Sequence, residues 1–112
     1  MGRSEGQLAK RGVGLKPSVG KKNKTYIRSL PCLVTGRYGS DPAHFPLRRS
    51  QGAQDSLLGL VPLCRDWHRK VDDYQQPYRG IVEELALEFH KRLVASEAFT
   101  EDELGERYWT EM

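Results

Sequence analysis

The fold of this chain is decided by the stretch LLGLVPLCRDWHRKVD at residues 57–72. Residues 57–63 form the most apolar run in the sequence. Because this run is short and contains both a glycine and a proline, we expect a buried strand that ends near the proline. Helical spacing follows over residues 64–74, with apolar side chains four apart at Leu63, Trp67 and Val71. The sequence therefore predicts a strand that leads directly into a helix.

The segments on either side supply the other expected elements. Residues 26–30 could form a short strand, and residues 41–47 form an extended segment that contains two prolines. A long helix is expected at residues 78–98, whose apolar stripe belongs either to the core or to an oligomer interface. The stripe recurs every four positions, at Ile81, Leu85, Phe89 and Leu93. Thr100 and Glu103 have the spacing of a capping box, which predicts a last short helix.

Charge is unevenly distributed along the 112 residues. Residues 1–24 hold seven basic side chains and one acid, with few apolar residues, so we expect a flexible basic arm followed by a single domain at residues 25–112. Residues 100–112 hold five acids and one arginine. The arm suggests a polyanion as partner, with nucleic acid as the first candidate. The alternative is a solvated arm that only keeps the protein soluble.

Several classes of protein are not expected from this composition. The sequence has no apolar run of about 18 residues, which a membrane span would need, and no apolar segment after its N-terminal charges. Its two cysteines, Cys32 and Cys64, are too few for a disulfide framework. We therefore expect a cytoplasmic protein without a membrane partner.

Three residues have the chemistry and the spacing of a hydrolytic site. His68 and Asp72 lie four apart on the expected helix, so their side chains project to the same side and could bind one metal ion. His44 precedes the apolar strand and would face the same cleft if strand and helix fold back on it. A histidine can take a proton from water, and a divalent ion can stabilise a leaving oxygen. These are the requirements of phosphodiester hydrolysis.

Each of these residues also has an ordinary structural interpretation. His44 could be a turn residue satisfied by backbone groups, and His68 with Asp72 could be a surface pair on a helix. His90, in the long helix, is expected to be structural or exposed.

Three segments follow one another within a 41-residue window: CLVTG at 32–36, DPAHF at 41–45 and VPLCRDWHRKVD at 61–72. This ordered set resembles the HNH endonuclease family, and within it the small phage and prophage nucleases whose metal-binding helix ends in H-x-x-x-D. The resemblance covers about residues 30–75. It implies an α+β fold built on a ββα-metal finger, with the C-terminal helix as a brace, and an endonuclease that cuts DNA with little base specificity.

The resemblance also implies roles for particular residues. His44 would be the general base, while His68 and Asp72 would hold one divalent ion, Mg²⁺ or Mn²⁺, in whose place Zn²⁺ or Ni²⁺ could bind. The family often has a further metal ligand directly before the base; here that position is Ala43, and Asp41 is the nearby substitute.

Two departures from the family pattern concern the asparagine and the zinc. The family's central asparagine falls near Gly59, so a backbone group or Asp55 would have to orient the base. Cys32 and Cys64 match the first residue of each zinc-binding pair, but their partner positions are a threonine, Thr35, and a tryptophan, Trp67. We therefore expect no structural zinc, with Trp67 as a hydrophobic plug and the two thiols close together.

DNA is the partner that the resemblance and the charge pattern suggest. The candidate phosphate contacts are Arg48, Arg49, Arg65, Arg69, Lys70, Lys21, Lys22 and Lys24, which could equally form a solvated face. The alternative function is a catalytically degenerate HNH descendant that binds DNA or a phage protein partner without cutting. A homodimer and an RNA-directed nuclease are further alternatives.

Overall fold

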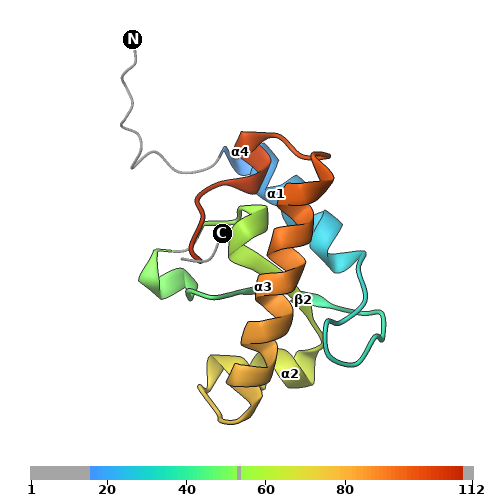
Figure 1. Cartoon of the computed structure of the whole chain (residues 1–112), viewed down its shortest axis with the longest axis vertical. Helices are drawn as coiled ribbons and strands as arrows, with labels where there is room; N and C mark the ends of the chain where they lie inside the picture. Colours follow the sequence, from blue (N-terminus) through green and yellow to red (C-terminus); the bar gives the residue numbers. More distant parts are fainter. Residues whose placement is uncertain (1–15, 53, 110–112) are drawn as a thin grey trace.

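An antiparallel pair of short strands lies at the centre of the computed structural model, which describes residues 16–52 and 54–109. β1 (Asp41–His44) pairs with β2 (Leu60–Leu63), and the register places Asp41 opposite Leu63 and His44 opposite Leu60. The strand expected within residues 57–63 is confirmed for its second half, since Leu57–Gly59 forms the 3-10 helix η2. Together with the helices, this sheet makes the α+β fold that we expected (Figure 1).

The helices that follow the sheet agree with the sequence pattern. One residue, Cys64, separates β2 from α2 (Arg65–Asp72), and α3 (Tyr78–Ser96) is the long helix expected from the sequence. α4 (Glu101–Leu104) begins with the expected capping box. The Thr100 hydroxyl accepts a hydrogen bond from the backbone of Glu103 at 3.1 Å, and the Glu103 carboxylate accepts one from the backbone of Thr100 at 2.8 Å. A second 3-10 helix, η1 (Arg49–Gln51), lies between the two strands in the sequence.

The N-terminal part of the described chain corrects the expectation. Helix α1 (Pro17–Arg28) covers the last part of the expected flexible arm, which was to extend to residue 24, and the first part of the strand expected at residues 26–30. Proline in the first turn favours a helix start. The buried side of α1 consists of Gly20, Asn23 and Ile27. Only one of these residues is apolar, so the helix has no hydrophobic periodicity to recognise; the arm's residues 1–15 lie outside the described part.

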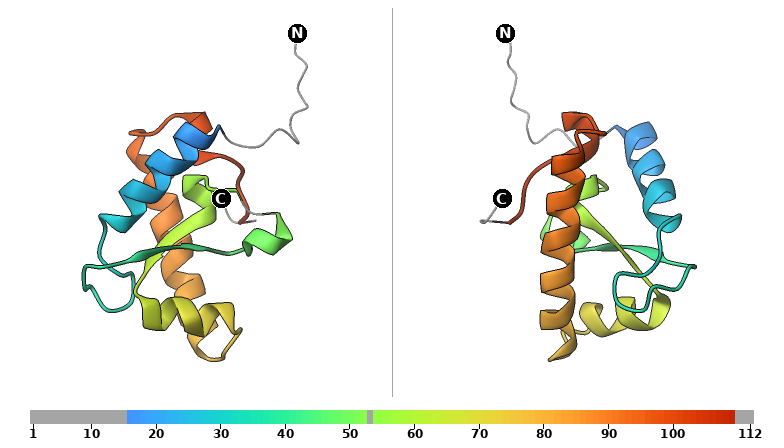
Figure 2. Two further views of the ribbon diagram at one scale, coloured as in Figure 1. Left: turned by 180° about the vertical axis from the view of Figure 1, so that it is seen from behind. Right: turned by 45° about the vertical axis from the view of Figure 1, so that its right-hand side comes forward.

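Two apolar clusters hold the elements together. One joins the sheet to α2 and α3 and contains Phe45, Val61, Leu63, Val71, Val82 and Ala86. The other joins α1, η2 and α4 to the C-terminal half of α3 and contains Ile27, Leu57, Leu58, Leu60, Leu93 and Leu104. The hairpin therefore lies between α1, in blue, and α3, in orange, as the right-hand view of Figure 2 shows.

The buried face of α3 differs from the expected stripe. Val82, Ala86, His90 and Leu93 are buried, whereas Ile81 and Leu85 are 44% and 37% exposed. The prediction that Ile81 and Leu85 belong to the core was therefore wrong. The sheet packs against the side of α3 that carries the next residues, Val82 and Ala86. Their role in an oligomer interface stays a prediction. No helix within residues 16–52 and 54–109 has the length and apolar character to cross a membrane.

The two cysteines lie close together, as expected. Burial raises the pKa of the Cys32 thiol, but hydrogen bonds from the Thr35 hydroxyl and from backbone groups that include the N–H of Cys64 outweigh it, and the pKa is about 7. Both thiols are free. Trp67 is half-buried against the first cluster, with its ring edge-on to Tyr78 at 5.5 Å between centroids, so it packs there as the expected plug.

Candidate functional site

His44 is the last residue of β1, and its side chain is held by a carboxylate from another part of the chain. The Nε2 atom of His44 lies 2.9 Å from Oδ1 of Asp55, and both side chains are 18% exposed. Backbone pairing continues past the end of the strand, because the N–H of Phe45 donates to the carbonyl of Gly59 at 3.0 Å. The base candidate is therefore fixed by a strand end and by a side-chain hydrogen bond.

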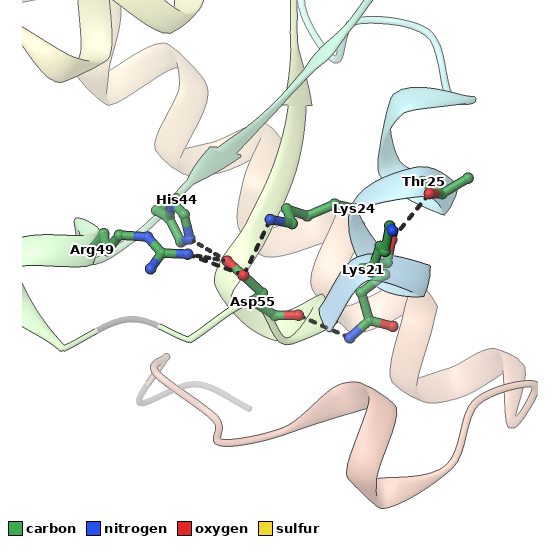
Figure 3. Close-up of polar contacts among 7 residues, drawn as sticks. Lys21, Lys24, Thr25, His44, Arg49 and Asp55 are labelled. Carbon is green, nitrogen blue, oxygen red and sulfur yellow. Dashed lines mark hydrogen bonds and ion pairs between the residues drawn. The ribbon is translucent and has the colours of Figure 1, made fainter. Parts of the chain in front are cut away.

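Two positively charged side chains also contact the carboxylate of Asp55 (Figure 3). Nη2 of Arg49 lies 3.0 Å from both carboxylate oxygens, and Nζ of Lys24 lies 3.4 Å from Oδ2. Burial raises the pKa of Asp55, but the hydrogen bond from His44 and the charges of Arg49 and Lys24 outweigh it and hold the pKa below its ordinary value. Asp55 is thus ionised at neutral pH.

His68 lies between two carboxylates that approach opposite ring nitrogens. Nε2 of His68 is 3.3 Å from Oδ2 of Asp72, and Nδ1 is 3.2 Å from Oδ2 of Asp41. Arg65 also contacts Asp41, through Nε at 3.2 Å. Burial raises the pKa of Asp41, but its hydrogen bonds with His68 and Arg65 and the charges of these groups bring it below the usual value. The helix spacing of His68 and Asp72 and the approach of β1 together fix this arrangement.

One cavity of about 440 Å³ brings the three expected residues together. Its lining consists of His44, Arg48, Arg49, Ser50, His68 and Asp72. Asp41 is not in this lining, since it contacts His68 from the other side of the ring. The strand, the loop after it and α2 therefore combine a histidine base candidate, a histidine–carboxylate pair and two arginines around one space.

The donor set that this cavity offers a metal ion is His68 with Asp72. Within residues 16–52 and 54–109, no three His, Cys, Asp or Glu side chains converge on a point that could hold an ion. An imidazole with a carboxylate fits an ion that keeps several waters and takes its other oxygens from a phosphate, as Mg²⁺ and Mn²⁺ do. His68 and Asp72 thus fit a divalent ion that takes its remaining ligands from outside the protein.

The eight basic candidates separate into two groups. Arg48 and Arg49 line the cavity, whereas the others lie elsewhere on the surface or on α1. Several of these others are paired with carboxylates of the protein: Lys22 with Glu103, Lys24 with Asp55, Arg65 with Asp41, and Lys70 with Asp66. Lys21 and Arg69 are exposed. Of the eight candidates, Arg48 and Arg49 are thus the ones that line the cavity.

Packing around Gly59, where the resemblance to the HNH pattern predicts an asparagine, leaves no room for a side chain. A Cβ at Gly59 would lie 2.9 Å from the backbone oxygen of Gln54 and 3.3 Å from the ring of Tyr108. An asparagine therefore does not fit there without displacing the backbone of Gln54. Of the two groups that could orient the base, the Asp55 side chain contacts the ring of His44, while the carbonyl of Gly59 contacts the backbone that follows it.

His90 has a structural role, which is one of the two alternatives expected from the sequence. It is buried, Nδ1 accepts a hydrogen bond from the indole of Trp109 at 2.8 Å, and Nε2 donates to the carbonyl of Leu60 at 2.8 Å. Burial lowers its pKa to about 4, although the hydrogen bond to Leu60 acts in the opposite direction. Because Leu60 is the strand partner of His44, this neutral histidine supports the sheet beneath the site.

Sequence reasoning missed Ser50 in the cavity lining and Arg79 behind it. Nη2 of Arg79 donates to the carbonyl of Pro46 at 2.9 Å, and Nη1 donates to that of Val71 at 3.2 Å. Arg79 thereby joins the loop after His44 to the end of α2. An isolated arginine in a helical segment carries no signal of such a role.

In comparisons with protein-family models, with curated proteins and with solved structures, nothing matches this chain.

Proposed function

We propose that this protein is a metal-dependent DNA endonuclease of the HNH type, whose ββα-metal finger consists of β1, β2 and α2. The observation that carries the proposal is the cavity in which His44, His68 and Asp72 meet beside two arginines. A protein that only bound nucleic acid would have no need to combine a base candidate with a histidine–carboxylate pair. Arginines suit the phosphodiester, since the guanidinium matches phosphate geometry.

In this proposal His44 takes the proton of the attacking water, as a histidine near neutral pH can do. His68 and Asp72 hold the divalent ion, which when bound stabilises the negative charge that develops on the scissile phosphate and the leaving oxygen. Arg48 and Arg49 bind the neighbouring phosphate oxygens. Contacts of this kind fix the position of the strand but read no bases, so cleavage has little sequence preference.

For Asp41 we propose a role other than the direct metal ligand expected from the sequence. Its carboxylate contacts Nδ1 of His68, which is the ring nitrogen opposite the one beside Asp72. Metal-binding histidines commonly donate their second N–H to a carboxylate, which fixes the ring and strengthens the ligand. Asp41 would therefore orient His68, and Nε2 of His68 and the carboxylate of Asp72 would be the groups left to hold the ion.

The test is cleavage of supercoiled plasmid by the full chain with Mg²⁺, with Mn²⁺ or with EDTA. We expect nicked or linear product only with the ions, and a loss of at least about 100-fold in rate for His44→Ala. Lys91→Ala, on the exposed side of α3, serves as the control and should cut as wild type does. A folded wild type that shifts DNA on a gel but leaves plasmid intact with every ion would contradict the proposal.

That contradicting outcome would favour the second candidate, a catalytically degenerate protein that binds DNA or a phage protein. The specific observation on its side is Gly59, where the family has its asparagine and where packing leaves no room for one. The two candidates differ in their requirements: an enzyme needs both His44 and a divalent ion, whereas a binding protein needs neither.

A further inference from the structure

We infer that Asp55 is the positioning residue of this site, which sets the tautomer of His44 and holds Arg49 beside it. The catalytic role that we give to Asp55 rests on the proposed function. The contacts that support it come from three separate parts of the chain, namely β1, η1 and α1 (Figure 3).

The hydrogen bond to His44 determines which ring nitrogen is basic. An ionised carboxylate can only accept hydrogen bonds, so Nε2 of a neutral His44 must carry the hydrogen that it shares with Oδ1 of Asp55 at 2.9 Å. The lone pair then resides on Nδ1. A general base needs its lone pair on the nitrogen that meets the water, and Asp55 makes that nitrogen Nδ1.

The contact with Arg49 places a cation next to this base. Both contacts to Asp55 use Nη2 of Arg49, so the carboxylate engages neither Nη1 nor Nε. The arginine side chain is 65% exposed and lines the cavity with His44. Arg49 can therefore present its other N–H groups to a phosphate oxygen while Asp55 fixes its position.

Helix α1 holds Asp55 by both its side chain and its backbone. Lys24 lies 3.4 Å from the carboxylate, and the amide of the neighbouring Asn23 donates to the Asp55 carbonyl at 3.0 Å. Asn23 is buried and also donates to the carbonyl of Glu103, so α1 and α4 together fix this loop. Two cations around one carboxylate leave an excess of positive charge beside His44, which favours a bound phosphate.

The first test reads the tautomer of His44 from the ring nitrogen and carbon-bound proton signals of ¹⁵N-histidine-labelled full-length protein, above neutral pH. We expect wild type to hold the Nε2–H form alone. Asp55→Ala should give a mixture of both tautomers, whereas Asp55→Asn, which keeps an oxygen acceptor, should retain the Nε2–H form. A wild type with the Nδ1–H form, or an Asp55→Ala spectrum unchanged from wild type, would overturn the inference.

The second test measures kcat and KM for cleavage of an oligonucleotide duplex. We expect Asp55→Ala to lower kcat about 10- to 100-fold, the range typical of residues that orient a reacting group, with Asp55→Asn between Asp55→Ala and wild type. Asp102→Asn, an exposed carboxylate on α4, should match wild type. An equal loss in Asp102→Asn and Asp55→Ala would contradict a specific role for Asp55.

The two readouts separate the inference from the proposed function. The ring spectrum requires no cleavage, so an inactive wild type with the expected tautomers would remove the nuclease proposal and leave the control of His44 by Asp55 intact. If Asp55→Ala fails to fold, the wild-type spectrum still tests the inference, because the Nδ1–H form there would overturn it.

Discussion

Oδ2 of Asp41 lies 3.2 Å from Nδ1 of His68, on the opposite side of the imidazole from Asp72. The contact joins the first residue of β1 to the middle of α2, across 27 positions of sequence. It fixes the ring plane of a histidine that would otherwise rotate at the edge of the cavity.

Replacing Asp41 by asparagine tests whether this carboxylate orients His68 or binds the ion itself. We expect Asp41→Asn to weaken Mn²⁺ binding about 10- to 100-fold, as is typical when an outer carboxylate is lost, and Asp72→Ala to weaken it further. Titration calorimetry of the folded variants measures both affinities. Asp102→Asn provides the control for loss of one negative charge. An Asp41→Asn affinity as low as that of Asp72→Ala would instead identify Asp41 as a direct ligand.

Acid should destabilise the protein through His90 before it protonates Asp41 and Asp55, whose pKa values are lowered. The pKa of His90 is lowered from about 6.5 to about 4, so below pH 6.5 the unfolded chain binds a proton that the folded chain does not. The free energy of unfolding therefore falls as the pH drops from about 6.5 to about 4, by up to about 1.4 kcal/mol per unit.

His90→Gln isolates this effect, since glutamine does not titrate but can donate to the Leu60 carbonyl. Urea unfolding at several pH values between 6.5 and 4 should give a shallower dependence for the variant than for wild type. Equal dependences would show that another group titrates.

The lowered pKa values of Asp41 and Asp55 affect stability at lower pH. The two ionised carboxylates stabilise the folded protein fully above a pH of about 3.9, and this contribution is lost as the pH falls further.

An asparagine at residue 59, the residue that the HNH pattern would have there, should destabilise the protein. A side chain there meets the backbone oxygen of Gln54 at 2.9 Å, so we expect Gly59→Asn to lower the free energy of unfolding by about 1–3 kcal/mol without raising the cleavage rate. Gly59→Ala should lose stability too, because the contact involves Cβ. Urea unfolding and plasmid cleavage measure the two effects. Faster cleavage by Gly59→Asn would mean that the site lacks an orienting group.

Arg49 should contribute one phosphate contact. We expect Arg49→Met to weaken binding to DNA of any sequence and to reduce the slope of log affinity against log salt by about 1. Fluorescence anisotropy in EDTA over a range of salt concentrations measures the slope without cleavage. Lys91→Met removes a positive charge on α3 and should leave the slope unchanged. A similar change in both variants would indicate that only the net charge matters.

Local patterns in the sequence determined a large part of this structure. The spacing of His68 and Asp72, the strand that leads into α2, the long helix α3 and the capping box of α4 all follow from interactions within a few residues. Such signals can be recognised because helix geometry brings positions four apart to the same side, whatever the rest of the chain does.

The relationships that distinguish this site were decided by tertiary structure. The side of α1 that packs against the body contains one buried apolar residue, Ile27, beside Gly20 and Asn23. Asn23 is buried because it donates hydrogen bonds to the carbonyls of Asp55 and Glu103, which are distant in the sequence. The sequence left Asp55 as one of two ways to orient His44, and its contact depends on how the loop before η2 is held. Sequence spacing specifies which groups share a helix face, but contacts between distant segments depend on the packing that brings them together.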